Sequence, residues 1–465
     1  MLCICLLGIT LLAIKTNVSR ADTPPPTSTP DIGAIEVLGL DTAIAIALSD
    51  NPTLTAARDR VRQARARLTQ VRSAYWPRLD ATASGSRVSL ADRTLEQQLA
   101  QARFFNPAAT IEDPEEYYRL GLSATWLLFN GFERKWSHAA AHMGIDQNEM
   151  SRLEIRRLLL SAVAQTYHAS QLALENLTIA HADGDFNQRL LAEANIRHRV
   201  GTGSLSDKLN FQIRVNAARA DEIRATEAYE TTRYSLAAIL GIADSRLPDN
   251  LKLASMAAED DKEMHSPEIK PLIDYALSHR PDILQGNLNR KQAGLSVKIA
   301  RAGYYPSVNL SASANGEHAG DTSFENEDFG NTLAVSLSYN LFSGGLTRAK
   351  VGQAKARLSE MDRNLTDTRL KAGAKVRSSH TKLIAAQRQL LLQRDNARLV
   401  KTQRNLVEKE YQAGQGSLVR LNEAQRDLIA AKGRLALALV SLRQAWFELK
   451  TETGRILEDF PVEKP

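Results

Sequence analysis

The chain has 465 residues, of which 43% are hydrophobic, 24% are charged and only 6% are aromatic. Its mean hydropathy of −0.30 excludes a protein built from membrane-spanning helices, and the composition suits long helices better than a compact core. The formal net charge is +6, and it falls by two, to +4, without residues 1–21, which hold Lys15 and Arg20 and no acid. Such a mild balance does not call for a nucleic-acid partner.

The chain starts with an apolar run, residues 2–14, that is too short to be a final membrane anchor. Residues 19–21 follow it and have the small-x-small pattern of a cleavage site. We therefore expect a signal peptide over residues 1–21, with a retained N-terminal anchor as the alternative, and a Pro/Thr-rich linker over residues 22–38. Both cysteines lie in the apolar run, so we expect no disulfide, zinc or thiol chemistry in the mature chain.

After residue 38 the sequence pattern occurs twice. The segment 47–52 returns 229 positions later at 276–281, and the segment 128–131 returns 213 positions later at 341–344. A repeat of this length is far longer than a solenoid unit and indicates a duplicated structural half. The predicted divisions are a first repeat at 39–250, an inter-repeat linker at 251–268, a second repeat at 269–455 and a C-terminal tail at 456–465.

Each repeat is expected to begin with helix. In the first repeat a short helix around residues 41–48 precedes a longer one from about Thr53 to Ser73. The helical pattern ends there because Pro77 disfavours helix in the residue before it. Pro306 occupies the matching place in the second repeat, so we expect the chain to become extended after both helices.

Two runs of alternating apolar and polar residues follow in each repeat. The clearest alternation has apolar residues at Leu120, Leu122, Ala124, Trp126 and Leu128 in the first repeat, and at Leu333, Val335, Leu337, Tyr339 and Leu341 in the second. Period-two alternation indicates a strand with one apolar face, and about ten residues is the length that a tilted strand needs to cross a bilayer. The connection between the strands is predicted to be a polar loop, longer in the first repeat, around residues 92–116.

The pattern then changes to a helical period for about 70 residues in each repeat, which is about 100 Å of continuous helix. The returning segment of the second repeat has leucine at every seventh position, which is typical of a coiled coil. The seven-residue series is Leu421, Leu428, Leu435, Leu442 and Leu449. Between the two helices, Gly201 and Gly414 fit helix C-caps, and Ser204 and Ser417 fit the N-caps that follow.

Open sheet edges are intolerable in hydrocarbon, so strands with a lipid-compatible face need a closed barrel. Four strands per chain cannot close one, whereas two chains would give eight strands and three chains would give twelve. The residues therefore favour a pore shared between subunits. A structural coiled-coil envelope protein without a pore remains the alternative, although such a protein does not need these strands. No phosphate-binding loop, zinc helix or nucleophile elbow occurs, so we expect no enzyme and no cofactor.

In this ordered, duplicated set of motifs the chain resembles the TolC family of outer-membrane efflux and type I secretion channels. The matching residues are Tyr75-Trp76-Pro77, Tyr304-Tyr305-Pro306, Tyr339-Asn340-Leu341-Phe342-Ser343-Gly344-Gly345, Val200-Gly201-Thr202 and Ala413-Gly414-Gln415. The resemblance implies a mainly α fold, with four strands per chain completing a trimeric twelve-stranded barrel in the outer membrane and a coiled-coil helical barrel across the periplasm. It also implies a passive export duct that works with a periplasmic adaptor and an inner-membrane ABC or proton-driven transporter. The missing lipid-anchor cysteine favours the type I secretion branch, and the cargo stays open.

The resemblance also points to site residues. In the family, acidic residues just past the helix tip ring the periplasmic entrance, and the corresponding positions here hold Arg420 and Glu423. Asp207 is the matched position in the first repeat, and our hypothesis is that Asp207 and Arg420 pair across neighbouring helices and hold the entrance closed. The alternative is that both are solvated charges. The tip residues expected to dock the adaptor are Val200, Gly201, Thr202, Ala413, Gly414 and Gln415.

Three further features are weighed against plain structural roles. Trp126 and Tyr339 occupy matched positions near strand ends, and a membrane-interface belt explains both, with ordinary packing as the alternative. His138 and His142 share a helix face, but no third ligand is fixed by the sequence, so we expect a surface pair and no metal site. The stripe of Arg58, Arg62, Arg65 and Arg72 is interpreted as a helix face paired with acids on neighbours.

Overall fold

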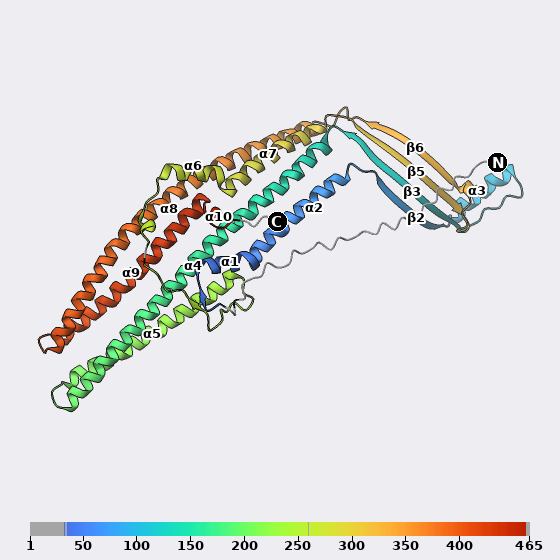
Figure 1. Cartoon of the computed structure of the whole chain (residues 1–465). Coiled ribbons are helices and arrows are strands. Elements are labelled where there is room, and N and C mark those ends of the chain that lie inside the picture. Colours follow the sequence, from blue (N-terminus) through green and yellow to red (C-terminus); the bar gives the residue numbers. More distant parts are fainter. Residues whose placement is uncertain (1–31, 33–34, 259, 462–465) are drawn as a thin grey trace. The chain divides into compact units, whose positions relative to one another are not determined.

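The computed structural model describes residue 32, residues 35–258 and residues 260–461 (Figure 1). The predicted signal peptide, most of the predicted linker and the last four residues lie outside this part of the chain. None of the helices within it combines the length and the apolar character that crossing a membrane requires.

The elements alternate between long helices and a few strands. The strand β1 (Val37–Leu38) precedes the first repeat. That repeat contains α1 (Leu40–Asp50), α2 (Pro52–Ser73), β2 (Arg78–Val88), α3 (Asp92–Phe105), β3 (Glu115–Asn130), α4 (Glu133–Arg199) and α5 (Leu205–Leu240). The rest of the chain contains β4 (Lys252–Leu253), η2 (Asp261–Met264), α6 (Ile269–His279), α7 (Pro281–Ala302), β5 (Ser307–Ala319), η3 (Asn326–Asp328), β6 (Phe329–Ser338), α8 (Leu346–Gln412), α9 (Leu418–Thr453) and α10 (Ile456–Asp459).

The helix boundaries repeat at the offsets read from the sequence. α4 and α8 each have 67 residues, and α5 and α9 each have 36 residues. α2 and α7 have 22 residues each, and α1 and α6 have 11. The first two pairs begin 213 positions apart and the last two pairs begin 229 positions apart. Equal helix lengths in the two halves follow from the unbroken register of the sequence repeat.

The chain divides into two compact units, and the long helices α4 and α8 each contribute to both. The tip unit comprises residues up to Pro52 together with 159–266 and 383–447. The strand unit comprises residues 53–158, 267–382 and 448–465. Each unit therefore combines segments from both sequence repeats.

The strand unit holds one antiparallel sheet in the order β2-β3-β5-β6 (Figure 1). Residues opposite each other in such a sheet share a face. Leu122 lies opposite Ala81 and Ala314, and Leu310 lies opposite Trp126 and Val335. Serine, threonine and asparagine dominate the other face over the same stretch. One apolar face therefore continues across all four strands, as the alternation predicted, and β2 and β6 are its edges.

The strand predictions need two corrections. The connection at 92–116, predicted as a polar loop, contains the helix α3, whose Phe104 and Phe105 are highly exposed. β6 ends at Ser338, so Tyr339 and Leu341 lie beyond the strand despite their alternation. The physical reason is that Ser338 pairs with Ser307, the first residue of β5, and β6 has no partner after it. A two-residue parallel pair, β1 with β4, adds a second small sheet in the tip unit.

The helices of the strand unit follow the same order as its strands. The Arg65 guanidinium of α2 pairs with Glu149 of α4 at 3.4 Å, and the side-chain amide of Gln147 on α4 donates to the Gln292 side-chain oxygen of α7 at 2.9 Å. Arg290 of α7 pairs with the carboxylate of Asp362 on α8. A buried cluster of Ile283, Leu365 and Ala372 also joins α7 to α8. The row is therefore α2, α4, α7, α8, with α2 and α8 at its edges.

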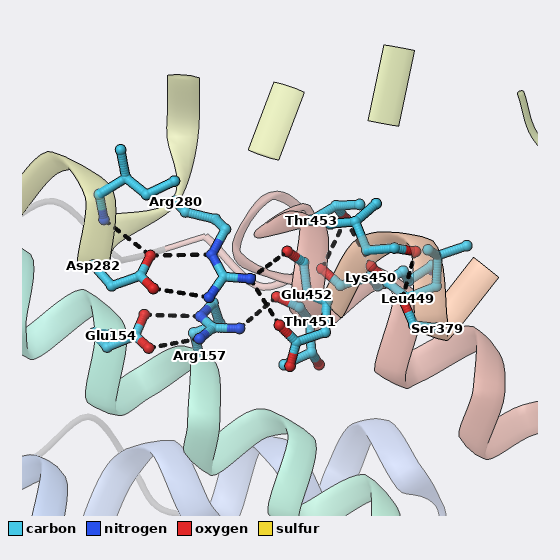
Figure 2. A network of polar contacts seen from close by, with 12 residues as sticks. Glu154, Arg157, Arg280, Asp282, Ser379, Leu449, Lys450, Thr451, Glu452 and Thr453 are labelled. Atoms are coloured by element: carbon cyan, nitrogen blue, oxygen red, sulfur yellow. Dashed lines mark hydrogen bonds and ion pairs between the residues drawn. The ribbon is translucent and has the colours of Figure 1, made fainter. Parts of the chain in front are cut away.

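A buried polar network surrounds the C-terminal end of α9 in the strand unit (Figure 2). Arg157, only 2% exposed, binds both carboxylate oxygens of Glu154 and donates to the carbonyl oxygen of Thr451 at 2.6 Å. Arg280 donates to both carboxylate oxygens of Asp282, at 3.0 and 2.8 Å, and to the carbonyl and carboxylate oxygens of Glu452, both at 2.7 Å. Two guanidinium groups thus tie α4 and the α6–α7 junction to the last turn of α9.

The two repeats use the residue before their helix-starting proline in the same way. Asn51 donates from its side-chain amide to the carbonyl oxygen of Ile239 at 2.9 Å, within the tip unit. Arg280, 229 positions later, donates to the carbonyl oxygen of Glu452, which lies 213 positions after Ile239. The donor is an amide in the first repeat and a guanidinium in the second. In both repeats the hydrogen bond connects the return helix, α5 or α9, to the start of α2 or α7.

Candidate functional site

The candidate site lies at the two turns that join the long helices in the tip unit. Gly201 and Gly414 adopt left-handed backbone conformations, with φ of 78° and 76°. Glycine is favoured there because a side chain would be strained. The hydroxyl of Ser204 accepts a hydrogen bond from the Ser206 amide at 3.1 Å, and that of Ser417 accepts one from the Arg420 amide at 3.3 Å. The predicted sequence of C-cap glycine and N-cap serine is confirmed at both turns.

The second glycine of each turn is required for space. A Cβ atom at Gly203 would lie 2.8 Å from the Arg197 Cβ and 3.0 Å from the His198 nitrogen. A Cβ atom at Gly416 would lie 2.9 Å from the Tyr411 nitrogen. The turns therefore press against the last turn of the preceding helix, which fixes the shape of the surface that Val200, Thr202, Ala413 and Gln415 present.

A buried cluster holds the two hairpins together just behind the turns. Its buried members are Phe186, Leu190, Ala194, Phe211, Val407, Leu421 and Ala424. They come from α4, α5, α8 and α9, so both repeats contribute to one core. The ring of Tyr411 packs at the edge of this cluster against Phe211, with the ring centres 6.4 Å apart, and the Arg197 guanidinium lies over it at 5.5 Å.

The predicted entrance residues lie on α5 and α9 of these hairpins. Arg420 is exposed and pairs within the chain with Glu410 of α8, at 3.3 Å. Burial raises the pKa of the Tyr411 hydroxyl, and the negative charge of Asp207 raises it further. Glu423 is exposed one turn past Arg420 on α9. Glu410 and Tyr411 were not predicted from the sequence, and their proximity to the glycine turn is the signal that could have identified them.

A polar network also links the hairpins in the tip unit, farther from the turns. The Gln425 amide donates to Asp183 at 2.7 Å, and Arg404 donates to the Gln425 oxygen at 2.9 Å. Burial raises the pKa of Asp183, while the hydrogen bond from Gln425 opposes that rise. Arg404 also pairs with Glu408 at 3.0 Å and lies over the ring of Phe186. Gln425 follows Leu421 of the leucine series in α9 by four residues. A polar residue at such a position is the feature of the sequence that could have identified it.

The predicted interface aromatics lie at one end of the sheet. Trp126 in β3 is 40% exposed, and its indole nitrogen donates to the carbonyl oxygen of Tyr75 at 3.0 Å. Tyr339 is 53% exposed and follows the end of β6. His138 packs edge-on against Tyr75, and His142 lies 3.9 Å from Asp146. Among the described residues, no group of three or more histidine, cysteine or acidic side chains could hold a metal ion.

Comparison with known proteins decides the family. The family model described as "Outer membrane efflux protein" matches residues 43–242 and 272–455. The chain belongs to this family. Its two matched segments coincide with the two halves of the fold, from within α1 to just after α5 and from within α6 to the end of α9.

Relatives and solved structures agree with this membership. The chain is 26% identical over 409 residues to the pyoverdine export outer membrane protein OpmQ of Pseudomonas aeruginosa, covering 87% of this chain and 82% of OpmQ. It is 25% identical to the protein CyaE of Bordetella pertussis, covering 93% and 86%. The crystal structure of the CmeC outer membrane channel of Campylobacter jejuni has the same fold, with a TM-score of 0.76 at 18% identity over 89% and 85% of the two chains.

This outer membrane efflux protein is an export channel of the outer membrane, with a long helical part in the periplasm. Its family and fold are those of channel proteins.

Proposed function

We propose that three copies of this outer membrane efflux protein close its four strands into a twelve-stranded barrel and its helices into a periplasmic duct. The observation that carries the proposal is the single apolar face across β2, β3, β5 and β6, whose two edge strands lack a partner within the described chain. Pairing β2 of one copy with β6 of the next satisfies both edges, as the bilayer requires.

The duct is a passive conduit with no catalytic role of its own. A periplasmic adaptor and an energised inner-membrane transporter, either an ABC transporter or a proton-driven pump, would deliver the cargo to it. The exposed glycine turns support docking of the adaptor, because they present a rigid surface at the end of both hairpins. Trp126 and Tyr339 would lie at the level of the lipid headgroups.

Cell fractionation and gel mobility test the assembly. We expect the protein in outer-membrane fractions as a trimer that resists mild detergent and runs as a monomer only after heating. A soluble, elongated dimer would contradict the proposed duct and favour the structural coiled-coil protein without a pore.

We further propose that Asp207, Arg420 and Glu423 control the periplasmic entrance. Arg420 has Glu410 as a partner within the chain, and a pairing with Asp207 across neighbouring helices would add a second constraint on the same guanidinium. Arg420→Ala should raise the resting single-channel conductance, because both constraints on the hairpin are lost. Glu227→Ala on α5 is the matched control, since it removes an exposed charge away from the turn. An unchanged resting conductance in Arg420→Ala would contradict the gating role.

A further inference from the structure

The two edge helices of the strand unit carry a large excess of positive charge. α2 has six arginines and one aspartate, and residues 346–382 of α8 have ten lysines and arginines and three acids. The acids of these segments already have partners in the chain. The pairs are Asp59 with Arg62, Asp362 with Arg290, Glu360 with Arg357 and Asp367 with Lys371. The acids of the two helices therefore neutralise only a few of the lysines and arginines on α2 and α8.

The cations lie on both flanks of each helix. Less exposed positions recur at spacings of three and four residues along α2 and α8, and they form the stripe that packs toward the next helix of the row. At 3.6 residues per turn, the positions directly after and directly before stripe residues lie on opposite flanks. The cations that follow a stripe residue include Arg72, Arg348, Lys355 and Arg377, and those that precede one include Arg60, Arg67, Lys350 and Lys375.

The matching flanks of the two helices face the same side of the row. α2 runs toward the strands and α8 runs away from them. Their stripes also point in opposite directions, since α2 packs toward α4 and α8 packs toward α7. The two reversals cancel, so the first set of four cations lies on one side of the row and the second set on the other.

All eight of these side chains are exposed, and none has an ion pair with an acid in the part of the chain that the structure describes. When the row of helices closes around a bore, one side faces the bore and the other faces the periplasm. Because both sides carry unpaired cations, α2 and α8 present positive charge to the bore whichever side lines it. This result does not depend on the direction in which the row curves.

We propose that this section of the channel is a cationic passage that accepts anionic, carboxylate-rich cargo. The inference rests on the proposed function, since it needs a closed bore. A water-filled passage with low-dielectric walls and charges of one sign concentrates ions of the opposite sign and repels others. Twelve unpaired cations from three chains would attract either an acidic polypeptide or a small multivalent carboxylate, which share the same chemistry.

Current block in planar bilayers tests the proposal on the purified full-length oligomer. We expect octaglutamate, added to each side in turn, to block the open current, and octalysine at the same concentration to leave it unchanged. Citrate as a second probe separates the two sources, because block by octaglutamate alone assigns extended acidic chains and block by both assigns carboxylates in general. Raising the salt from 0.1 to 1 M should relieve the block, because the screening length falls from about 10 to about 3 Å.

Two matched variants identify the cations that act. One replaces Arg72, Arg348, Lys355 and Arg377 with glutamine, and the other replaces Arg60, Arg67, Lys350 and Lys375. Each removes four exposed positive charges, so both should still form the oligomer on a gel. The half-blocking concentration of octaglutamate should rise about tenfold or more in at least one variant, the one whose flank lines the bore.

Three results would overturn the proposal. They are a conducting pore that no anionic probe blocks, block by octalysine equal to that by octaglutamate, and block that is unchanged in both variants. Loss of lipid association in the variants with unchanged block would mean that the cations bind anionic lipid instead. A conducting pore with any of these results leaves the proposed function intact, whereas the absence of a pore overturns the function itself.

Discussion

Arg280 is a cation that the fold keeps almost wholly from water and surrounds with two carboxylates, Asp282 and Glu452 (Figure 2). Burial alone would lower the pKa of Arg280, but its hydrogen bonds to both acids raise it instead. Although burial opposes ionisation of Asp282, the hydrogen bond and charge of Arg280 hold the pKa of that carboxyl below its usual value. The network is therefore charged at neutral pH and stabilises the C-terminal end of α9.

Replacing Arg280 by methionine should strongly destabilise the protein. Asp282 and Glu452 would stay largely buried without their cation, and breaking a buried pair in this way costs about 3–5 kcal/mol. The measurement is the free energy of unfolding from urea titration followed by circular dichroism. Arg363→Met, an exposed arginine on α8, should change it by no more than about 0.5 kcal/mol. Equal unfolding midpoints for the two variants would contradict the role of the network.

The same network predicts a loss of stability in acid. Because the pKa of Asp282 is lower in the folded state than in the unfolded chain, its contribution is complete above about pH 4 and is lost as the pH falls toward the folded pKa. Thermal midpoints measured between pH 6 and pH 3 should fall less steeply in Asp282→Asn than in the wild type. Parallel pH profiles would contradict this assignment.

His168 of the tip unit predicts a second pH effect, at higher pH. It is only 4% exposed, its Nδ1 lies 3.0 Å from the Gln171 oxygen and its Nε2 has no hydrogen-bond partner among the described residues. Burial lowers its pKa, so its contribution to stability is complete above about pH 6.5 and is lost as the pH falls below that value. The thermal midpoint should drop between pH 7.5 and 5.5, and the drop should shrink in His168→Phe. A full drop in the variant would assign it to other groups.

Among the elements, the turns at the helix tips leave little room for added side chains. Gly203→Ala would push a methyl group into Arg197 and His198 and should cost about 1–3 kcal/mol locally. Trypsin cleavage after Arg197 and Arg199 should therefore become faster. Gly433→Ala in α9 is the control, because its Cβ meets nothing closer than 4.0 Å and alanine favours helix by about 0.5–1 kcal/mol. Equal cleavage rates would contradict the crowding at the turn.

Helix boundaries could be predicted from the sequence, while several local features could not. The seven-residue leucine series and the fixed offsets locate α4, α5, α8 and α9, because a long strict period has few alternative interpretations. α3 was missed because its segment has no counterpart in the second repeat, although Leu95, Leu99 and Ala102 have helical spacing. The end of β6 was missed because pairing with β5, and not alternation, ends the strand.

The polar partners of Arg280 and Arg420 could not be predicted from the sequence, for a different reason. Arg280 binds acids from two separate elements, and Arg420 lies opposite Glu410 across a turn. Such pairs depend on how helices rotate about their axes when they pack, which the apolar pattern fixes only after the neighbours are known. The turn glycines, by contrast, could be identified because each turn type demands its residue.

At the scale of the whole molecule, the duplication supplies two halves of equal helix length, and the strands supply one continuous apolar face. These two properties are what a channel of the outer membrane efflux protein family needs to close around a bore. The cationic edge helices then give the bore a charge. We therefore expect the closed assembly to form a water-filled passage through a bilayer.

Conductance of the purified, unheated oligomer in planar lipid bilayers tests this claim most directly. We expect discrete, uniform current steps as single oligomers insert, and none from protein that has been heated to monomers. A well-folded oligomer that inserts into the bilayer and yet carries no current would contradict it.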